Sequence, residues 1–184
     1  MTILGILIAV CLLYIIGVYN TLIRKRNNID NAFASIDVML KKRFDLIPNL
    51  VATVKQYAKH EENIFSTVTE MRAKGYEQLN SEDKVAFDEA FTQASRLFIA
   101  VAESYPELKA SDNFMHLQRT LNEVEEQLSA ARRTFNANVT DYNNAVMIFP
   151  SNMIARIFGF TSRKVFSIPE EERENVNTKN LFQS

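Results

Sequence analysis

The sequence is poor in the residues that build disulfides, metal sites and phosphate-binding loops. Its 184 residues include one cysteine, two histidines, four glycines and no tryptophan. A single cysteine, Cys11, allows no intramolecular disulfide, and two histidines without a further cysteine argue against a structural zinc site. Four glycines spread along the chain cannot form a Gly-rich phosphate loop. We therefore expect no cofactor and no metal.

The sequence also lacks a catalytic constellation. His60-Glu61 begins like the metalloprotease signature, but Ile64 stands where the second histidine ligand belongs. No elbow motif holds a serine or a cysteine beside a base. The formal net charge is −1, so no basic field indicates a nucleic-acid partner. These absences predict a protein that is not an enzyme and binds no nucleic acid.

What the sequence does have is a charge-free stretch from Thr2 to Ile23, followed by Arg24-Lys25-Arg26. As a helix this stretch spans roughly 33 Å, the thickness of a bilayer's hydrocarbon core. No basic region precedes it and no small-residue cleavage site follows it, which predicts an uncleaved single-pass signal anchor over residues 1–23. By the positive-inside rule, the basic cluster places the rest of the chain in the cytoplasm. We assign lipid contact to Ile6, Leu7, Leu12, Leu13, Ile15 and Ile16.

Beyond the anchor, apolar residues recur at steps of three and four, which predicts helices. Pro48 interrupts the first run, and two interpretations remain open. Either one long helix is kinked between Phe44 and Pro48, or the chain reverses, so that Asp45 caps a new helix with Pro48 in its first turn. The apolar residues keep their phase through the proline, which favours the kink.

Two further helices are expected before residue 150. Ser81 is the predicted cap of one that Pro106 ends, and Ser111 or Asp112 caps another that ends at Phe149-Pro150. Near-heptad apolar seams of this length predict coiled-coil-like packing in a helical bundle over residues 24–150. The seam of the last helix is Phe114, Leu117, Leu121, Val124, Leu128, Ala131, Phe135, Val139, Tyr142, Val146 and Phe149.

The segment 151–166 mixes apolar and aromatic residues with cations. This composition is typical of a short amphipathic segment at a membrane surface, although a short arm that closes the end of the bundle is the alternative. The residues assigned to membrane-surface contact are Ile154, Ile157, Phe158, Phe160, Arg163 and Lys164. The polar tail, 167–184, lacks periodicity and is predicted to be disordered.

Asparagine is a poor helix former, yet it gathers at two predicted helix ends. Asn136, Asn138, Asn143 and Asn144 lie near the end of the last helix, and Asn20, Asn27, Asn28 and Asn31 lie at the start of the first. If the two ends are neighbours, the amides form a polar belt that can bond between helices or to another subunit. Simple tolerance of asparagine on exposed faces is the alternative.

Several blocks of the sequence form an ordered set, of which the most specific is Arg43-Phe44-Asp45-Leu46-Ile47-Pro48-Asn49-Leu50-Val51, and later blocks include Tyr105-Pro106-Glu107-Leu108-Lys109 and Phe158-Gly159-Phe160. On these blocks the chain resembles the LemA family of bacterial membrane proteins. The resemblance implies an all-α protein with one N-terminal membrane helix and an antiparallel four-helix bundle, and it shifts the interpretation of Pro48 toward a reversal. It implies no catalytic residues.

Two functions are then expected for a protein of the bacterial cytoplasmic membrane. The first is a scaffold that self-associates as a homo-oligomer and organises the bilayer. The second is an adaptor for a membrane protease or an envelope-stress or signalling partner, because members of the family often occur beside a membrane zinc metalloprotease. We assign the subunit interface to Asn20, Asn27, Asn31, Arg43, Asp45, Pro48, Asn136 and Asn143.

Overall fold

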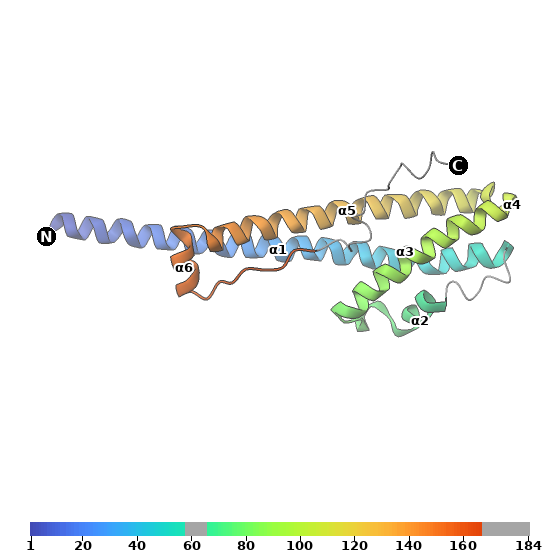
Figure 1. The fold of residues 1–184 in the computed structure, drawn as a ribbon, viewed down its shortest axis with the longest axis horizontal. Coiled ribbons are helices and arrows are strands. Elements are labelled where there is room, and N and C mark those ends of the chain that lie inside the picture. The colour runs from blue at the N-terminus through green and yellow to red at the C-terminus, as the bar shows by residue number, and fades with distance from the viewer. Residues whose placement is uncertain (58–65, 167–184) are drawn as a thin grey trace, which may run out of the picture. The chain divides into compact units, whose positions relative to one another are not determined.

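The computed structural model describes residues 1–57 and 66–166. Within these residues every regular element is a helix, which confirms the all-α class (Figure 1). The predicted disordered tail, 167–184, lies outside the described residues, as does the His60-Glu61 pair. The elements are α1 (Thr2–Tyr57), α2 (Ser66–Lys74), η2 (Tyr76–Gln78), α3 (Ser81–Ser104), α4 (Pro106–Lys109), α5 (Asp112–Met147) and α6 (Ser151–Ile157).

The chain divides into two compact units, to which α1 and α5 both contribute residues. The anchor unit comprises Met1–Ile29 and Thr134–Ser184, and the core unit comprises Asp30–Arg133. This division differs from the predicted segments, whose boundaries stay predictions. The antiparallel four-helix arrangement also stays a prediction.

Pro48 lies inside α1, so the reversal that the family resemblance favoured is wrong. A proline inside a helix removes the backbone donor that would bond the carbonyl four residues earlier. That carbonyl belongs to Phe44, and the Arg72 guanidinium of α2 donates to it at 3.0 Å. The same guanidinium lies 5.6 Å from the centre of the Phe44 ring. A side chain of α2 thus replaces the bond that the proline cannot make.

Short-range signals set the helix ends in the core unit. Asn80 caps α3 with its Oδ1, which accepts from the Asp83 backbone N–H at 2.8 Å, and Asp83 completes a capping box. The predicted cap at Ser81 is therefore wrong by one residue. Ser111, as predicted, precedes α5, and its Oγ accepts from the Phe114 N–H at 3.3 Å. Gly75 ends α2 with a φ of 82°, a conformation that favours glycine.

The core unit buries large aromatic side chains. Phe87 and Phe98 are fully buried, and Phe98 stacks on Phe114 with ring centres 4.8 Å apart. Phe44 lies between Tyr76 and Phe87, at 5.4 Å and 5.6 Å. These residues carry the predicted seams of α1, α3 and α5, so the seams face a shared interior.

Candidate membrane-proximal site

The anchor unit presents its apolar side chains outward. By length and composition, α1 is the one helix among the described residues that can cross a membrane, and none of its most apolar window is buried. Of the assigned lipid contacts, Ile15 is partly covered and the others are exposed. A helix that is apolar all round and unburied needs an apolar solvent. This matches a membrane helix.

A second apolar surface lies at the end of α5 and on α6. We call it the apolar collar, and each of its side chains is at least half exposed: Met147, Ile148, Phe149, Met153, Ile157 and Phe158. Large apolar side chains that stay exposed close together in the chain are candidates for membrane or protein contact. Ile154 and Ala155 are buried and hold α6 in place.

The collar corrects the predicted membrane-surface set. Ile157 and Phe158 are exposed as expected, but Ile154 is buried at 6% exposure and faces the protein. Phe160 is half-buried, with its ring 5.8 Å from Tyr19. Arg163 and Lys164 are exposed. The exposed apolar surface therefore begins earlier in the chain, because α5 ends at Met147 and leaves the following residues outside its seam.

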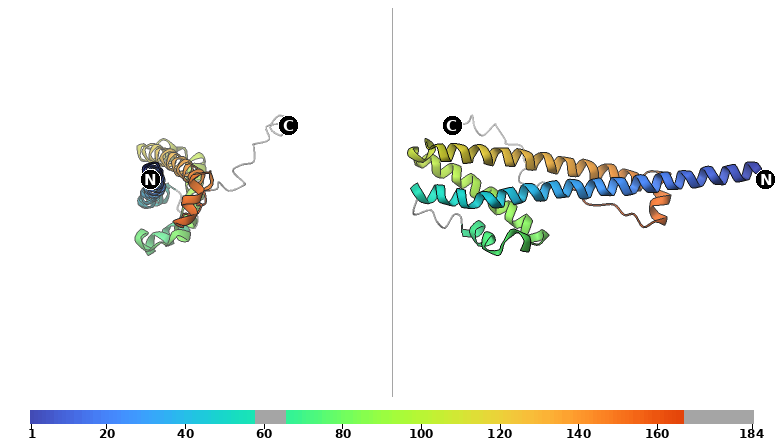
Figure 2. Two further views of the ribbon diagram at one scale, coloured as in Figure 1. Left: turned by 90° about the vertical axis from the view of Figure 1, so that its left-hand side faces the viewer. Right: turned by 180° about the vertical axis from the view of Figure 1, so that it is seen from behind.

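The turn after α6 sends the chain back along the anchor unit. Gly159, with a φ of 72°, donates to the Arg156 carbonyl at 3.3 Å, and the Phe160 N–H donates to the Ala155 carbonyl at 2.8 Å. This pair of bonds is the Schellman ending of a helix. Tyr19 of α1 then packs against Phe158 at 4.9 Å. The remaining residues, 160–166, have no regular structure and run back from α6 along the α1–α5 pair (Figures 1 and 2).

Two asparagines of α5 hold this returning segment, and we call them the asparagine clamp. The Asn143 amide accepts from the Arg163 N–H and donates to the Arg163 carbonyl, both at 2.8 Å. The Asn136 amide makes the same pair of bonds with Phe166, at 2.8 Å and 3.0 Å. Seven residues of helix rise about 10.5 Å, and three residues of extended chain cover about 10 Å, so the two registers match.

The other asparagines divide between internal bonds and exposure. Asn138 donates to the Asn28 carbonyl at 3.4 Å, which brings α1 and α5 together at that point. Asn20 and Asn27 are exposed and lie one heptad apart, hence on one face of α1. Asn31, in the core unit, is exposed as well.

An ion-pair network crosses the interior of the core unit. Arg43 of α1 is 2% exposed and pairs with Asp88 of α3 and Glu125 of α5, while Arg132 also pairs with Asp88. Burial lowers the pKa of the Arg43 guanidinium, the charge of Asp88 opposes this, and that of Arg132 adds to it. Arg43 also donates to Thr92 at 3.3 Å. A residue buried in this way is not free to contact a partner, so its assignment to a subunit interface is wrong.

The other assigned interface residues in this unit are accessible. Asp45 accepts from Lys41, one turn earlier, at 2.6 Å and 2.8 Å, and it is exposed, as is Pro48. A second polar cluster joins Tyr76, Asp37 and Lys84. The Tyr76 hydroxyl donates to the Asp37 carboxylate at 2.8 Å, and the Lys84 ammonium donates to it at 2.6 Å.

The electrostatics of this second cluster follow from those bonds. Burial by itself raises the pKa of Asp37. The hydrogen bonds from Lys84 and Tyr76 and the charge of Lys84 lower it by more, so the pKa of Asp37 lies below its usual value. Burial and the Asp37 carboxylate raise the pKa of the Tyr76 hydroxyl. The cluster thus holds Asp37 ionised and Tyr76 protonated. No group of three or more histidine, cysteine or acidic side chains is placed to hold a metal within residues 1–57 and 66–166.

This chain is similar to known proteins over most of its length. Magnetosome protein MamQ 2 of Paramagnetospirillum magneticum is 26% identical over 191 aligned positions, which cover 90% of this chain and 70% of that protein. Magnetosome protein MamQ of Magnetospirillum gryphiswaldense is 24% identical over the same shares. Protein LemA of Metamycoplasma hominis is 27% identical, with 90% and 76% covered.

The family model for LemA matches residues 32–179, which is most of the chain. This match includes the Arg43–Val51 block and the asparagine clamp. The chain belongs to the LemA family, as a membrane-associated helical protein.

Proposed function

We propose that this protein is a membrane-tethered scaffold that self-associates and organises the bilayer around it. The observation that carries the proposal is the pair of exposed asparagines, Asn20 and Asn27, beside the basic end of the membrane helix. Amide side chains in such a position bond between helices and fix their register. The apolar collar supports the membrane side of the proposal, because it gives the anchor unit a second lipid contact.

The relatives support a membrane-associated role. Those that match over 90% of this chain include proteins named for the magnetosome. A single-pass anchor alone holds a protein on a membrane, whereas an anchor with a collar beside it also displaces lipid at the interface. Repetition of this unit in an oligomer would add the displacements of the individual copies, which is how a scaffold acts on bilayer shape.

The test of self-association is the mass of the full-length protein in detergent and in lipid nanodiscs, measured by light scattering. We expect a multi-subunit assembly for the unaltered chain. The assembly of the Asn20→Ala/Asn27→Ala double variant should begin to dissociate at a protein concentration about tenfold or more above that at which the unaltered assembly dissociates, because each subunit loses two amide bonds.

The matched control is Asn28→Ala, which removes an exposed amide from the neighbouring face of α1 and leaves the Asn28 carbonyl in place. This variant should keep the mass of the unaltered protein. A strictly monomeric unaltered protein would contradict the proposal. Equal dissociation of both variants would show that Asn20 and Asn27 are not specific to the subunit interface.

The orientation that we propose follows from Arg24, Lys25 and Arg26 at the end of the apolar stretch: the residues after the anchor are cytoplasmic, in a bacterial inner membrane. Protease added to intact cells should leave residues 24–184 uncut. Cleavage within these residues would contradict the proposed orientation. A membrane protease as partner stays a prediction from the family resemblance.

A further inference from the structure

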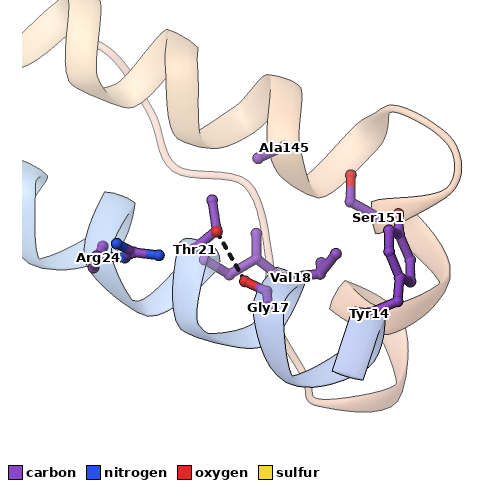
Figure 3. A pocket seen from close by; sticks show the side chains of 8 residues that line it. Tyr14, Gly17, Val18, Thr21, Arg24, Ala145 and Ser151 are labelled. Atoms are coloured by element: carbon purple, nitrogen blue, oxygen red, sulfur yellow. Dashed lines mark hydrogen bonds between the residues drawn. The ribbon is translucent and has the colours of Figure 1, made fainter. Parts of the chain in front are cut away.

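A groove of about 420 Å³ lies in the anchor unit, where α1 passes the turn from α5 to α6 (Figure 3). This volume is within the range of small-ligand sites. Tyr14 and Ser151 stand together at one end of the view in Figure 3, and Arg24 stands at the other. The lining residues are Tyr14, Gly17, Val18, Thr21, Leu22, Arg24, Ala145 and Ser151.

The walls of the groove offer few free polar atoms. The Thr21 hydroxyl donates to the Gly17 carbonyl of its own helix at 2.8 Å, and the Ser151 hydroxyl donates to the Ile148 carbonyl at 2.9 Å. Gly17 and Ala145 are small, and a Cβ built on Gly17 would meet no atom within 4 Å. Because Gly17 and Ala145 are short and apolar, the middle of the groove is open and apolar.

The Arg24 end carries a positive charge without an acidic partner. Lys25, the next residue, forms an ion pair with Asp141. Arg24 forms no ion pair with any carboxylate in the part of the chain that the structure describes, and its Nε donates only to the Asn20 carbonyl, at 3.4 Å. An anion placed at this end would therefore find a cation that the protein leaves unneutralised.

The position of the groove along the membrane helix indicates what fills it. From Tyr14 to Arg24, α1 rises about 15 Å, which is half the thickness of the hydrocarbon core. The apolar end therefore lies at the depth of acyl chains and the Arg24 end at the depth of headgroups. Water does not reach the first of these depths, so the occupant is a lipid.

We infer that the groove binds one anionic phospholipid, with an acyl chain along the apolar wall and the phosphate at Arg24. The inference rests on the proposed function, because it requires α1 to span the bilayer. An anionic headgroup is favoured over a zwitterionic one by about fivefold for one unneutralised arginine near the surface.

The test uses the absence of tryptophan from the chain. Tyr14→Trp places a single fluorophore in the groove of the full-length protein, which is reconstituted in phosphatidylcholine vesicles. Acyl-brominated phosphatidylglycerol or acyl-brominated phosphatidylcholine is added at equal mole fractions, and the quenching of the fluorophore is measured. We expect phosphatidylglycerol to associate about fivefold more strongly than phosphatidylcholine at this position.

Three variants control for general effects. Ile16→Trp lies at nearly the same depth, is 55% exposed and does not line the groove, so it should show no preference between the two lipids. In the Tyr14→Trp background, Arg24→Gln should abolish the preference. Arg26→Gln removes the same charge from a residue outside the groove and should preserve it.

A second way to close the site is Ala145→Leu in the same background, which fills the groove and should also abolish the preference. Equal preference at Tyr14→Trp and Ile16→Trp would overturn the inference, because the effect would then come from surface charge in general. Loss of the preference on addition of inorganic phosphate would overturn the lipid assignment in favour of a phosphate site.

The failure of the inference is distinguishable from the failure of the proposed function. Quenching at both positions without selectivity overturns the lipid site alone and leaves α1 in the bilayer. Absence of quenching at both positions means that α1 does not lie in lipid, and it overturns the inference together with the membrane-tethered scaffold.

Discussion

In the core unit Phe87 and Phe98 are completely buried, whereas in the anchor unit Phe149 and Phe158 are 73% and 51% exposed. The same residue type therefore has two environments in one chain. Phe87 and Phe98 of the core unit pack against protein, whereas Phe149 and Phe158 of the anchor unit present their rings outward. The difference shows that exposure of apolar side chains near the membrane helix is an organised feature of the fold.

The units also differ in how they satisfy polar groups. The core unit holds charges together, with Asp88 between Arg43 and Arg132. Besides the Lys25–Asp141 ion pair, the anchor unit uses two neutral amides, Asn136 and Asn143, which bond to the backbone of the returning segment. A neutral amide costs less to desolvate than a charge, which suits a region beside a membrane.

The largest expected difference between the units concerns the buried and exposed phenylalanines. Phe98→Ala should lower the free energy of unfolding by about 3–5 kcal/mol, because it leaves a cavity. Phe149→Ala should change it by at most about 0.5 kcal/mol, because the side chain has little protein around it. Denaturant unfolding of the detergent-solubilised protein, followed by circular dichroism, measures both. Equal costs would contradict the contrast between the units.

The next largest effect concerns the ion-pair network of the core unit. Asp88→Ala should cost about 3 kcal/mol of stability, because it leaves Arg43 buried with Glu125 as its remaining acidic partner. The matched control is Asp45→Ala, which breaks an exposed pair with Lys41 and should cost about 0.3–0.5 kcal/mol. If the two variants cost the same in thermal unfolding, the network does not stabilise the unit.

The asparagine clamp should show a smaller and local effect. Asn143→Ala removes both bonds to Arg163 and should weaken the attachment of the returning segment by about 1–2 kcal/mol. Hydrogen exchange at the Arg163 amide should then accelerate about tenfold, with the global unfolding midpoint nearly unchanged. Asn144→Ala, an exposed neighbour, should leave that exchange rate as it is. Unchanged protection of the Arg163 amide in the Asn143→Ala variant would show that Asn143 does not hold the returning segment.

The smallest expected effect is on the pH dependence of the core unit. Because the folded-state pKa of Tyr76 lies above its usual value of 10.0, the stability that its hydroxyl provides is complete below pH 10 and is lost above it. The free energy of unfolding of the unaltered protein should exceed that of the Tyr76→Phe variant by roughly 1 kcal/mol at pH 7–9. That difference should shrink above pH 10 in parallel urea titrations. A constant difference would show that the hydroxyl proton is not involved.

Much of the fold was predictable because its signals are local. The charge-free stretch before Arg24 indicates the membrane helix, and the unbroken seam from Phe114 indicates α5. These patterns depend on spacing alone, so they survive without knowledge of the tertiary structure.

The features that escaped prediction depend on distant partners. The helix passes through Pro48 because Arg72, 28 residues after Phe44, supplies the missing donor. Arg43 is buried because Asp88 and Glu125 come from two other helices. No local pattern announces such partners.

The candidate site was predictable in its composition and not in its contacts. The crowding of asparagines was visible, but the clamp bonds to backbone atoms of Arg163 and Phe166, which every residue carries. Phe149 continued the seam of α5 in the sequence, which concealed the collar that begins where the helix ends. A side chain at the end of a seam faces protein or lipid according to what packs there.

Spin labelling measures whether the apolar collar lies in lipid, as the membrane-tethered scaffold requires. Cys11 is the chain's one cysteine, so Cys11→Ser gives a background for single labels at Ile157→Cys on α6 and at Met115→Cys on α5. Both side chains are exposed, at 76% and 51%. In lipid nanodiscs the label at residue 157 should collide mainly with oxygen, and that at residue 115 with an aqueous nickel complex. Equal nickel accessibility at the two positions would show that the apolar collar lies in water.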